Sequence, residues 1–95
     1  MSNQTALVTG ASDGIGLEFC KILASRGYNL ILVARREAKL NEIAIDLRQS
    51  HAVQCTVIAA DLSLPQAAQI LFQNTKDQRL QVDFLINNAG LLHNG

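Results

Sequence analysis

The sequence predicts an α/β fold in which helices cover both faces of a doubly wound parallel sheet. Short apolar runs without polar alternation, typical of strands buried on both sides, alternate with segments whose apolar residues recur at helical spacing. A glycine-rich stretch, TGASDGIG, joins the first apolar run to the first helical segment. The expected order is therefore β-α-β-α-β-α-β, within a single region that spans residues 1–95.

The first strand and the first helix follow directly from this pattern. Residues 5–9 (TALVT) form a short apolar run suited to a buried strand. A helix should begin at Gly14 and end before Gly27, a residue suited to the left-handed conformation that follows many helices. The residues expected on the inner face of this helix are Gly16, Phe19, Cys20 and Leu23.

The next two elements have equally clear signals. Residues 29–34 (NLILVA) lack polar alternation and predict a second strand that is buried on both sides. A helix is expected to follow Arg35, Arg36 and Glu37, with its polar side chains facing water. The apolar residues that recur on its inner face are Leu40, Ile43, Ala44 and Leu47.

The last expected elements are a strand, a helix and a further strand. The strand is predicted at residues 52–60 (AVQCTVIAA), and Ser63 is predicted to cap the following helix, with Pro65 in its first turn. The inner face of that helix should carry Ala67, Ile70 and Leu71. The final strand, residues 82–87 (VDFLIN), is as apolar as the inner strands. We therefore expect further chain to cover it, and interpret the sequence as part of a larger domain.

Composition argues against several functional classes. Eight Lys and Arg residues balance eight Asp and Glu residues, which argues against a general binder of nucleic acid or of membrane surfaces. The N-terminus lacks the basic and apolar regions of a secretory signal, and the longest apolar run, residues 30–34, is too short to span a bilayer. Cys20 and Cys55 have no CxxC spacing and are expected to be buried thiols. A reducing compartment, the cytoplasm, is therefore the expected location.

The glycine-rich stretch predicts contact between the backbone and an anion. In a βαβ unit the turn after the first strand lies at a helix N-terminus, where free N–H groups and the helix dipole attract negative charge. Gly10 would permit the tight turn, Gly14 the approach of a pyrophosphate, and Gly16 the close packing of helix and strand. A P-loop is excluded because the sequence contains no Gly-Lys-Ser/Thr. The alternative is a turn whose glycines serve geometry alone.

Two motifs resemble the N-terminal signatures of the short-chain dehydrogenase/reductase family: TGASDGIG at residues 9–16 and NNAG at residues 87–90. VARRE and ADLS also fit the ends of the second and third strands, and the resemblance covers essentially all 95 residues. It implies a Rossmann-like fold, of which this chain would be about half. It further implies an oxidoreductase that transfers hydride between NAD(P)(H) and a small-molecule carbonyl or alcohol substrate. The complete protein of that kind would be a homo-oligomer.

The resemblance also implies cofactor contacts. The residues that would line the pyrophosphate and the adenosine ribose are Gly10, Ser12, Asp13, Gly14, Ile15 and Gly16. Asp61 and Leu62 would meet the adenine. Asn88, Ala89 and Gly90 would lie beside the ribose and steady the central sheet. A turn role for Asp61 is the alternative, and strand-end hydrogen bonding by Asn87 and Asn88 is compatible with a cofactor role.

The end of the second strand indicates which dinucleotide is bound. In this fold an acidic residue there binds the ribose 2′-hydroxyl of NAD, whereas an arginine accommodates the 2′-phosphate of NADP. Here the strand ends in Arg35 and Arg36, and a guanidinium matches a phosphate in geometry and charge. We therefore predict NADP(H) over NAD(H), the alternative being a solvated arginine pair. Asp13 stands where NADP-preferring members of the family often carry a basic residue.

The catalytic groups that the resemblance implies are not in the sequence. The family uses a serine and a Tyr-x-x-x-Lys pair for proton transfer, whereas the single tyrosine, Tyr28, is followed four positions later by Leu32. His51 and His93 do not suggest a pair, and no metal-ligand cluster is visible. We expect these residues alone to include no catalytic residue, to bind no metal and to show no enzymatic turnover. A non-catalytic dinucleotide-binding or interaction module is the competing interpretation, and a methyltransferase is a more distant one.

Overall fold

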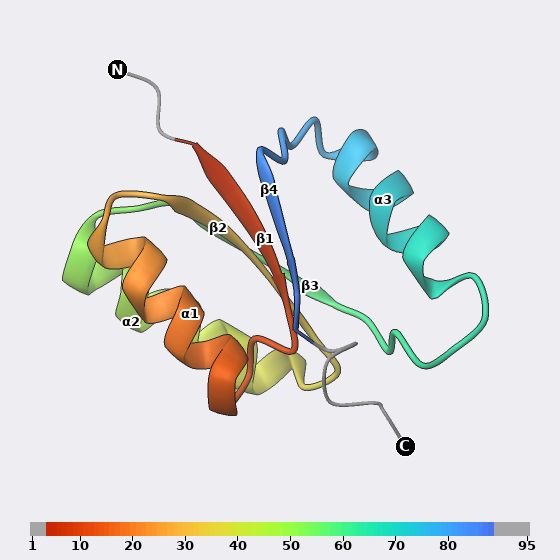
Figure 1. The fold of residues 1–95 in the computed structure, drawn as a ribbon, viewed down its shortest axis with the longest axis horizontal. Helices are drawn as coiled ribbons and strands as arrows, with labels where there is room; N and C mark the ends of the chain where they lie inside the picture. The colour runs from red at the N-terminus through yellow and green to blue at the C-terminus, as the bar shows by residue number, and fades with distance from the viewer. Residues whose placement is uncertain (1–3, 89–95) are drawn as a thin grey trace.

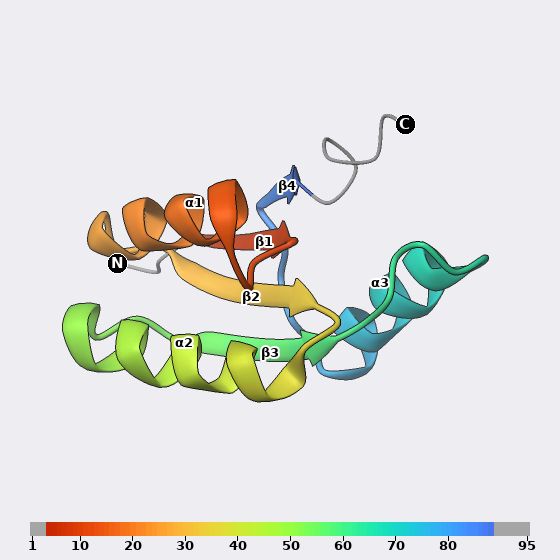
Figure 2. The same ribbon diagram turned by 90° about the horizontal axis from the view of Figure 1, so that it is seen from below.

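A computed structural model describes residues 4–88, which form one sheet of four parallel strands with three helices (Figure 1). The strands are β1 Thr5–Thr9, β2 Asn29–Ala34, β3 Cys55–Ala59 and β4 Phe84–Asn87. The helices are α1 Gly14–Ser25, α2 Glu37–His51 and α3 Ala67–Asp77. The sheet order is β3-β2-β1-β4, with α1 and α2 on one face and α3 on the other (Figure 2). The predicted doubly wound α/β class is confirmed.

The strand pairing places all carboxyl ends at one edge of the sheet. β1 lies between β2 and β4 and pairs with both in parallel, and β3 pairs with β2 in the same sense. The start of β4 is joined to β1 by two reciprocal bonds: the Asp83 N–H donates to Thr5 O, and the Thr5 N–H donates to Asp83 Oδ2, both at 2.8 Å. The turns that follow β1, β2 and β3 therefore lie next to one another.

Each face of the sheet buries its own apolar cluster, because successive side chains of a strand point to opposite faces. In β1, Ala6 and Val8 belong to the cluster beneath α1 and α2, whereas Leu7 belongs to the cluster on the side of α3. All three side chains are 0% exposed. A strand that is buried in this way needs apolar residues at every position, which explains the continuous apolar runs of β1 and β2.

Helix α2 has the inner face that its sequence predicts, whereas α1 and α3 each differ at one position. In α2, Leu40, Ala44 and Leu47 are buried and Ile43 is partly buried. The sequence predicts that Phe19 of α1 and Ile70 of α3 are inside, but they are 36% and 66% exposed. These two side chains lie on flanks that the other described residues leave uncovered. The predicted Gly16 and Cys20 of α1 and Ala67 and Leu71 of α3 are buried, together with Ala24 and Thr75, which were not predicted there.

Two strands are shorter than predicted. β3 spans Cys55–Ala59 instead of residues 52–60, since Ala52 ends α2 in the left-handed conformation with a φ of 56°. β4 spans Phe84–Asn87 instead of residues 82–87. In both cases the predicted run includes part of the connection that leads into the strand, because an apolar residue, Val53 or Val82, lies in that connection.

The predicted cap of α3 is wrong. The helix begins at Ala67, after Gln66 in the left-handed conformation with a φ of 66°, and no side chain caps it. The Ser63 hydroxyl donates instead to the carboxylate of Asp61, two residues earlier. Serine and aspartate side chains stabilise turns as readily as helix starts, so a nearby carboxylate competes with the helix for the hydroxyl.

The predicted helix stop and the buried thiols are confirmed. Gly27 follows α1 with a φ of 87°, and its N–H donates to Ala24 O at 3.0 Å. Cys20 and Cys55 are free and buried. Burial raises the pKa of the Cys20 thiol to about 12 and also raises the pKa of Cys55. Both thiols are therefore neutral at physiological pH.

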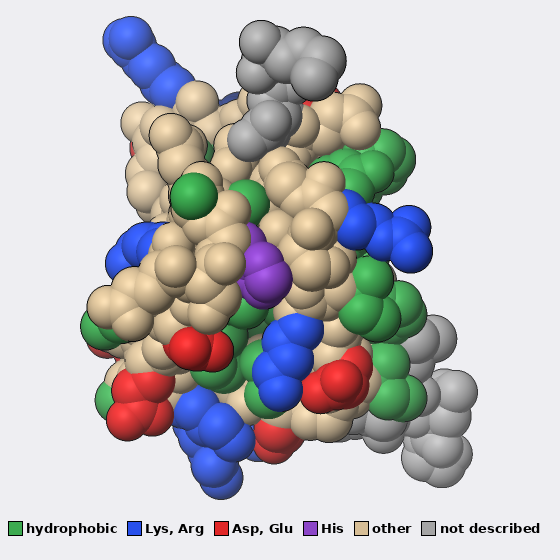
Figure 3. Space-filling view, turned by 90° about the vertical axis from the view of Figure 1, so that its left-hand side faces the viewer, with side chains coloured by type: hydrophobic (Ala, Val, Ile, Leu, Met, Phe, Trp, Pro, Cys, Tyr) green, Lys and Arg blue, Asp and Glu red, His purple; other side chains and the backbone are tan. Residues whose placement is uncertain are grey.

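The surface charges, the helices and the potential metal ligands of the described residues add little to this picture. Figure 3 shows one side of the molecule, on which basic and acidic side chains are interspersed without a continuous patch of either sign. Among residues 4–88, no helix combines the length and the apolar character that crossing a membrane requires. The same residues contain no group of His, Cys, Asp and Glu side chains that could hold a metal ion.

Candidate functional site

The carboxyl edge of the sheet gathers the turns that follow three strands. Gly10 turns the chain out of β1 with a φ of 65°, in the left-handed region that favours glycine. The next residue, Ala11, donates its N–H to Val33 O of β2 at 3.1 Å. The N–H of Ala60 in turn donates to Ala34 O at 2.9 Å. These bonds continue the sheet past its last paired residues and hold the three turns together.

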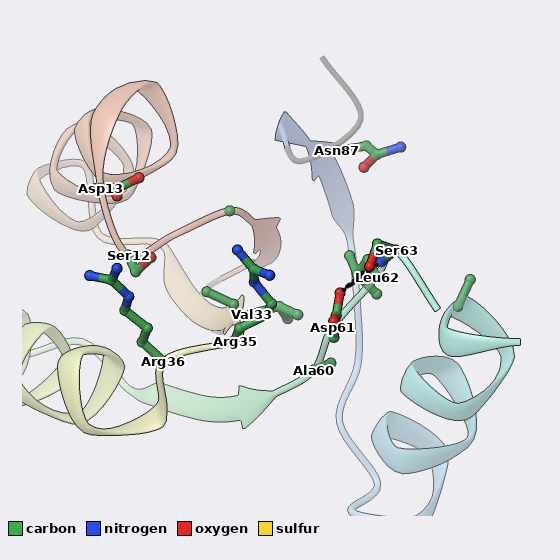
Figure 4. Close-up of a pocket in the computed structure, with 13 residues that line it drawn as sticks. Ser12, Asp13, Val33, Arg35, Arg36, Ala60, Asp61, Leu62, Ser63 and Asn87 are labelled. Atoms are coloured by element: carbon green, nitrogen blue, oxygen red, sulfur yellow. Dashed lines mark hydrogen bonds between the residues drawn. The ribbon is translucent and has the colours of Figure 1, made fainter. Parts of the chain in front are cut away.

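Between these turns lies a cleft with a volume of about 570 Å³ (Figure 4). It is bounded by the turn before α1, by the end of β2, by the loop after β3, and by the end of β4. The residues that line it are Gly10, Ser12, Asp13, Val33, Ala34, Arg35, Arg36, Ala60, Asp61, Leu62, Ser63, Ala68 and Asn87. The cleft thus lies at the position where open parallel sheets bind their ligands.

Gly16 permits the close packing of α1 on the turn. A Cβ atom at this position would lie 2.0 Å from Gly10 O and 2.8 Å from Asn88 Nδ2. Any side chain would therefore force the backbone apart, as the sequence predicts for this glycine. Gly14 differs, because a Cβ atom there would have no neighbour within 4 Å, although its φ of 56° still favours glycine. The open space at Gly14 leaves the backbone of the turn accessible.

The N-terminus of α1 opens beside the cleft. Asp13 occupies the cap position but makes no side-chain capping bond. The Leu17 N–H donates to Asp13 O at 3.2 Å, and helices leave the N–H groups before this first bond without a partner of their own. The combined dipole and free N–H groups form an environment that favours an anion.

Arg35 and Arg36 supply the positive charge of the cleft. Both side chains are exposed and project from the end of β2 toward the turn that carries Ser12 (Figure 4). Within residues 4–88, neither guanidinium makes an ion pair or a hydrogen bond. The two guanidinium groups are thus available to a phosphate. The carboxylate of Asp13 lines the same cleft.

Asp61 combines a turn role with a place in the cleft. Its Oδ1 accepts hydrogen bonds from the Ser63 N–H at 3.0 Å and from Ser63 Oγ at 2.6 Å. The turn role that the sequence leaves open is therefore present. Asp61 also lines the cleft, and its predicted contact with a base stays a prediction.

The other predicted site residues lie in three different places. Gly14 and Ile15 line a shallow apolar hollow along the exposed flank of α1, together with Glu18, Phe19 and Ile22. Gly16 and Asn88 are buried beneath the turn, where Asn88 Nδ2 donates to Gly10 O at 3.4 Å and Asn88 Oδ1 has no partner in the described part of the chain. Ala89 and Gly90 lie outside the described residues, as does His93. The cofactor contacts predicted for these residues stay predictions.

Six lining residues were not predicted as cofactor contacts, and two of them, Ser63 and Asn87, have polar side chains; the other four are Val33, Ala34, Ala60 and Ala68. Asn87 ends β4, and its Oδ1 accepts a hydrogen bond from Thr9 Oγ1 at 3.2 Å. Ser63 holds Asp61, as described above. Asn87 precedes the predicted Asn88 directly, and only the alternation of side chains along β4 shows which of the two faces the cleft. The sequence predicts Ser63 as a helix cap, and its hydrogen bonds to Asp61 were therefore not predicted.

Tyr28 and His51 lie away from the cleft. Tyr28 directly precedes β2, at the opposite edge of the sheet, and its ring contacts Phe84 edge-on with centroids 5.8 Å apart. His51 is the last residue of α2, also at that edge. Neither side chain can therefore exchange a proton with a ligand in the cleft.

Similarity to known proteins gives the family. A family model described as short chain dehydrogenase matches residues 4–95. The chain belongs to the short-chain dehydrogenase family. This short-chain dehydrogenase chain is 43% identical over 90 residues to a very-long-chain 3-oxoacyl-CoA reductase from Pyrenophora tritici-repentis. The match covers 93% of the chain but 26% of the reductase, so the chain spans about a quarter of that relative.

Two solved structures share the fold of this short-chain dehydrogenase chain. L-sorbose reductase from Gluconobacter frateurii, complexed with NADPH and L-sorbose, is 31% identical with a TM-score of 0.84, over 92% of this chain and 33% of its own. A short-chain dehydrogenase from Sphingobium yanoikuyae in complex with NADPH is 37% identical with a TM-score of 0.70, over 81% of this chain and 30% of its own.

Proposed function

We propose that this chain binds NADP(H) in the cleft and belongs to an oxidoreductase that transfers hydride between NADP(H) and a carbonyl or alcohol substrate. The observation that carries the proposal is the meeting, in one cleft, of the glycine turn at Gly10 and Ser12 with the guanidinium groups of Arg35 and Arg36. Membership of the short-chain dehydrogenase family supports it, as do the NADPH complexes of two similar structures.

The residues of the cleft fit the parts of the cofactor. The pyrophosphate would rest on the turn, where the α1 N-terminus offers N–H groups and the space at Gly14 admits a phosphate close to the backbone. The 2′-phosphate would meet Arg35 and Arg36 at the end of β2. Asp61 and Leu62 would border the adenine. Phosphate recognition and base recognition thus come from separate strands.

The role of the chain is to bind and orient the cofactor. Bound NADPH supplies the hydride, and the reaction also needs an acid that protonates the developing alkoxide. Tyr28 lies at the opposite edge of the sheet in contact with Phe84, and the sequence holds no Tyr-x-x-x-Lys. We therefore propose that residues 1–95 alone do not catalyse hydride transfer, and that other residues of the protein provide the proton.

Titration with both dinucleotides tests the cofactor assignment. The dissociation constants of NADPH and NADH are measured on the full-length protein. We expect tighter binding of NADPH, and Arg35→Ala should weaken it by about 10- to 100-fold, since a charge-assisted hydrogen bond contributes roughly 1.5–3 kcal/mol. The affinity for NADH should change little. The control is Arg26→Ala, which removes an exposed guanidinium at the far end of α1.

The outcomes separate the proposal from its competitors. Equal or tighter binding of NADH would overturn the NADP assignment, as would equal losses in Arg35→Ala and Arg26→Ala. NADPH binding without oxidation in the presence of any carbonyl substrate would favour a non-catalytic dinucleotide-binding module. NADPH oxidation by residues 1–95 alone would show that proton transfer needs no further residues.

A further inference from the structure

Ser63 lies in the cleft without a role in the function proposed so far. It is contributed by the loop between β3 and α3, and its side chain points toward Asp61 (Figure 4). Both of its donors bind the same oxygen: the N–H lies 3.0 Å and the hydroxyl Oγ 2.6 Å from Asp61 Oδ1. The hydroxyl bond is short, and the charge of the carboxylate strengthens it.

The hydroxyl bond is separable from the shape of the loop. The turn is held independently by the Leu64 N–H, which donates to Asp61 O at 3.2 Å, and by the Ser63 N–H. Loss of the hydroxyl alone would leave both N–H bonds in place, one to the Asp61 carbonyl and one to its carboxylate. It would remove one of the bonds that restrain the carboxylate, whose terminal torsion is otherwise broad. The hydroxyl therefore acts on the orientation of the Asp61 side chain.

A carboxylate held in this way distinguishes two classes of purine. When ionised, it accepts hydrogen bonds and donates none. A 6-amino purine offers it a donor, whereas a 6-oxo purine offers an acceptor that the carboxylate repels. The discrimination depends on the carboxylate staying in place, because a carboxylate that is free to rotate can avoid the unfavourable contact.

We propose that Ser63 is a positioning residue that holds the Asp61 carboxylate for recognition of the amino group of adenine. The inference rests on the proposed NADP(H) site and deepens it at the base. Ser63 makes no contact with the cofactor in this scheme. Its effect is on base selectivity, and it leaves the affinity for the phosphates unchanged.

The test compares NADPH with its 6-oxo analogue, the reduced hypoxanthine dinucleotide phosphate. We expect the protein to prefer NADPH, and Ser63→Ala to reduce the ratio of the two dissociation constants by about fivefold, the value of one ordinary hydrogen bond. Ser63→Thr, which keeps the hydroxyl, should retain the ratio. Ser25→Ala is the matched control, because Ser25 Oγ donates at 2.6 Å to Ile22 O in an exposed part of α1.

Each outcome bears on the inference or on the site beneath it. An unchanged ratio in Ser63→Ala overturns the inference, as does an equal loss of ratio in Ser25→Ala or in Ser63→Thr. Equal binding of both dinucleotides by the unmodified protein also overturns it, while leaving the NADP(H) site intact. If the unmodified protein binds neither dinucleotide, the proposed function fails. The ratio is measured within each variant, so a general loss of stability does not imitate the expected result.

Discussion

β1 and β4 are neighbours in the sheet with similar apolar sequences, yet their side chains have very different surroundings. Leu7 of β1 is 0% exposed, whereas Leu85, its register partner on β4, is 51% exposed. Strand β1 has a paired strand on each side, while β4 has one only on the side of β1 in the described residues. An apolar run therefore indicates that a strand can be buried, and its neighbours decide whether it is.

The same contrast separates the parts of the cleft. The turn before α1 and the pair Arg35 and Arg36 follow β1 and β2, the most deeply buried strands. Asn87, at the end of β4, is the contribution of the exposed strand. The groups proposed to bind phosphate thus stand on the rigid centre of the sheet, where small displacements cost most.

Truncating the two register partners should give the largest difference. Leu7→Ala should lower the free energy of unfolding by about 2–5 kcal/mol, because it removes buried contacts and leaves a cavity. In residues 1–95, where Leu85 is exposed, Leu85→Ala should lower it by less than about 1 kcal/mol, as for other exposed positions. Denaturant titration of both variants measures the difference. Equal losses would show that β4 is as well buried as β1 in solution.

Adding one methyl group tests the packing beneath the cleft. Gly16→Ala should lower the free energy of unfolding by about 3 kcal/mol, because the new Cβ atom would lie 2.0 Å from Gly10 O and the backbone must move. Gly14→Ala meets open space, and its cost of about 1–2 kcal/mol is that of the left-handed conformation. The two variants are compared by thermal and chemical unfolding. A larger loss in Gly14→Ala would contradict the packing described.

The buried cluster should also make stability depend on alkaline pH. The thiol of Cys20 has an ordinary pKa of 9.0 and a folded-state pKa of about 12, because burial disfavours the thiolate. Its contribution to stability is complete below pH 9 and falls between pH 9 and pH 12, since only the unfolded chain releases the proton there. The slope is about 1.4 kcal/mol per pH unit. Unfolding at pH 8, 9 and 10 should show a smaller loss of stability in Cys20→Ala than in the unmodified protein, because Cys55, whose pKa is also raised by burial, keeps its own contribution.

The smallest effects are expected where non-glycine residues adopt the left-handed conformation. Ala52 and Gln66 have φ values of 56° and 66°, so replacement of either by glycine should raise the free energy of unfolding by about 0.5–1 kcal/mol. Ala38→Gly is the control: this exposed residue lies within α2, where glycine should cost about 1 kcal/mol. A loss of stability in Ala52→Gly would indicate that the loop does not hold this conformation in solution.

The sequence contains enough information to predict the central strands and the corners of the cleft. The bounds of β1 and β2 agree with the apolar runs, because a strand buried on both faces tolerates no polar residue until it ends. Arg35 and Asp61 directly follow predicted strands or their extensions, so the parallel topology alone brings them to one edge.

Side chains whose surroundings depend on distant elements could not be predicted. Phe19 and Ile70 have helical spacing typical of an inner face, but burial at these positions needs a neighbour that the pattern does not reveal. Ser63, just before Pro65 in the chain, has the sequence of a helix cap. In the structure its hydroxyl donates to the carboxylate of Asp61 and does not cap the helix. Whether that carboxylate is within reach depends on the geometry of the loop, which the sequence pattern does not reveal.

The reciprocal bonds between Thr5 and Asp83 join residues 78 positions apart in the chain. On the ribosome, which adds roughly 5–20 residues per second, β1 and β2 can pair while one edge of β1 waits for seconds until β4 emerges. During that interval the nascent sheet presents unpaired backbone groups beside an apolar surface. Co-translational folding of this chain therefore includes a period in which a chaperone that binds extended segments would compete with the arrival of its own last strand.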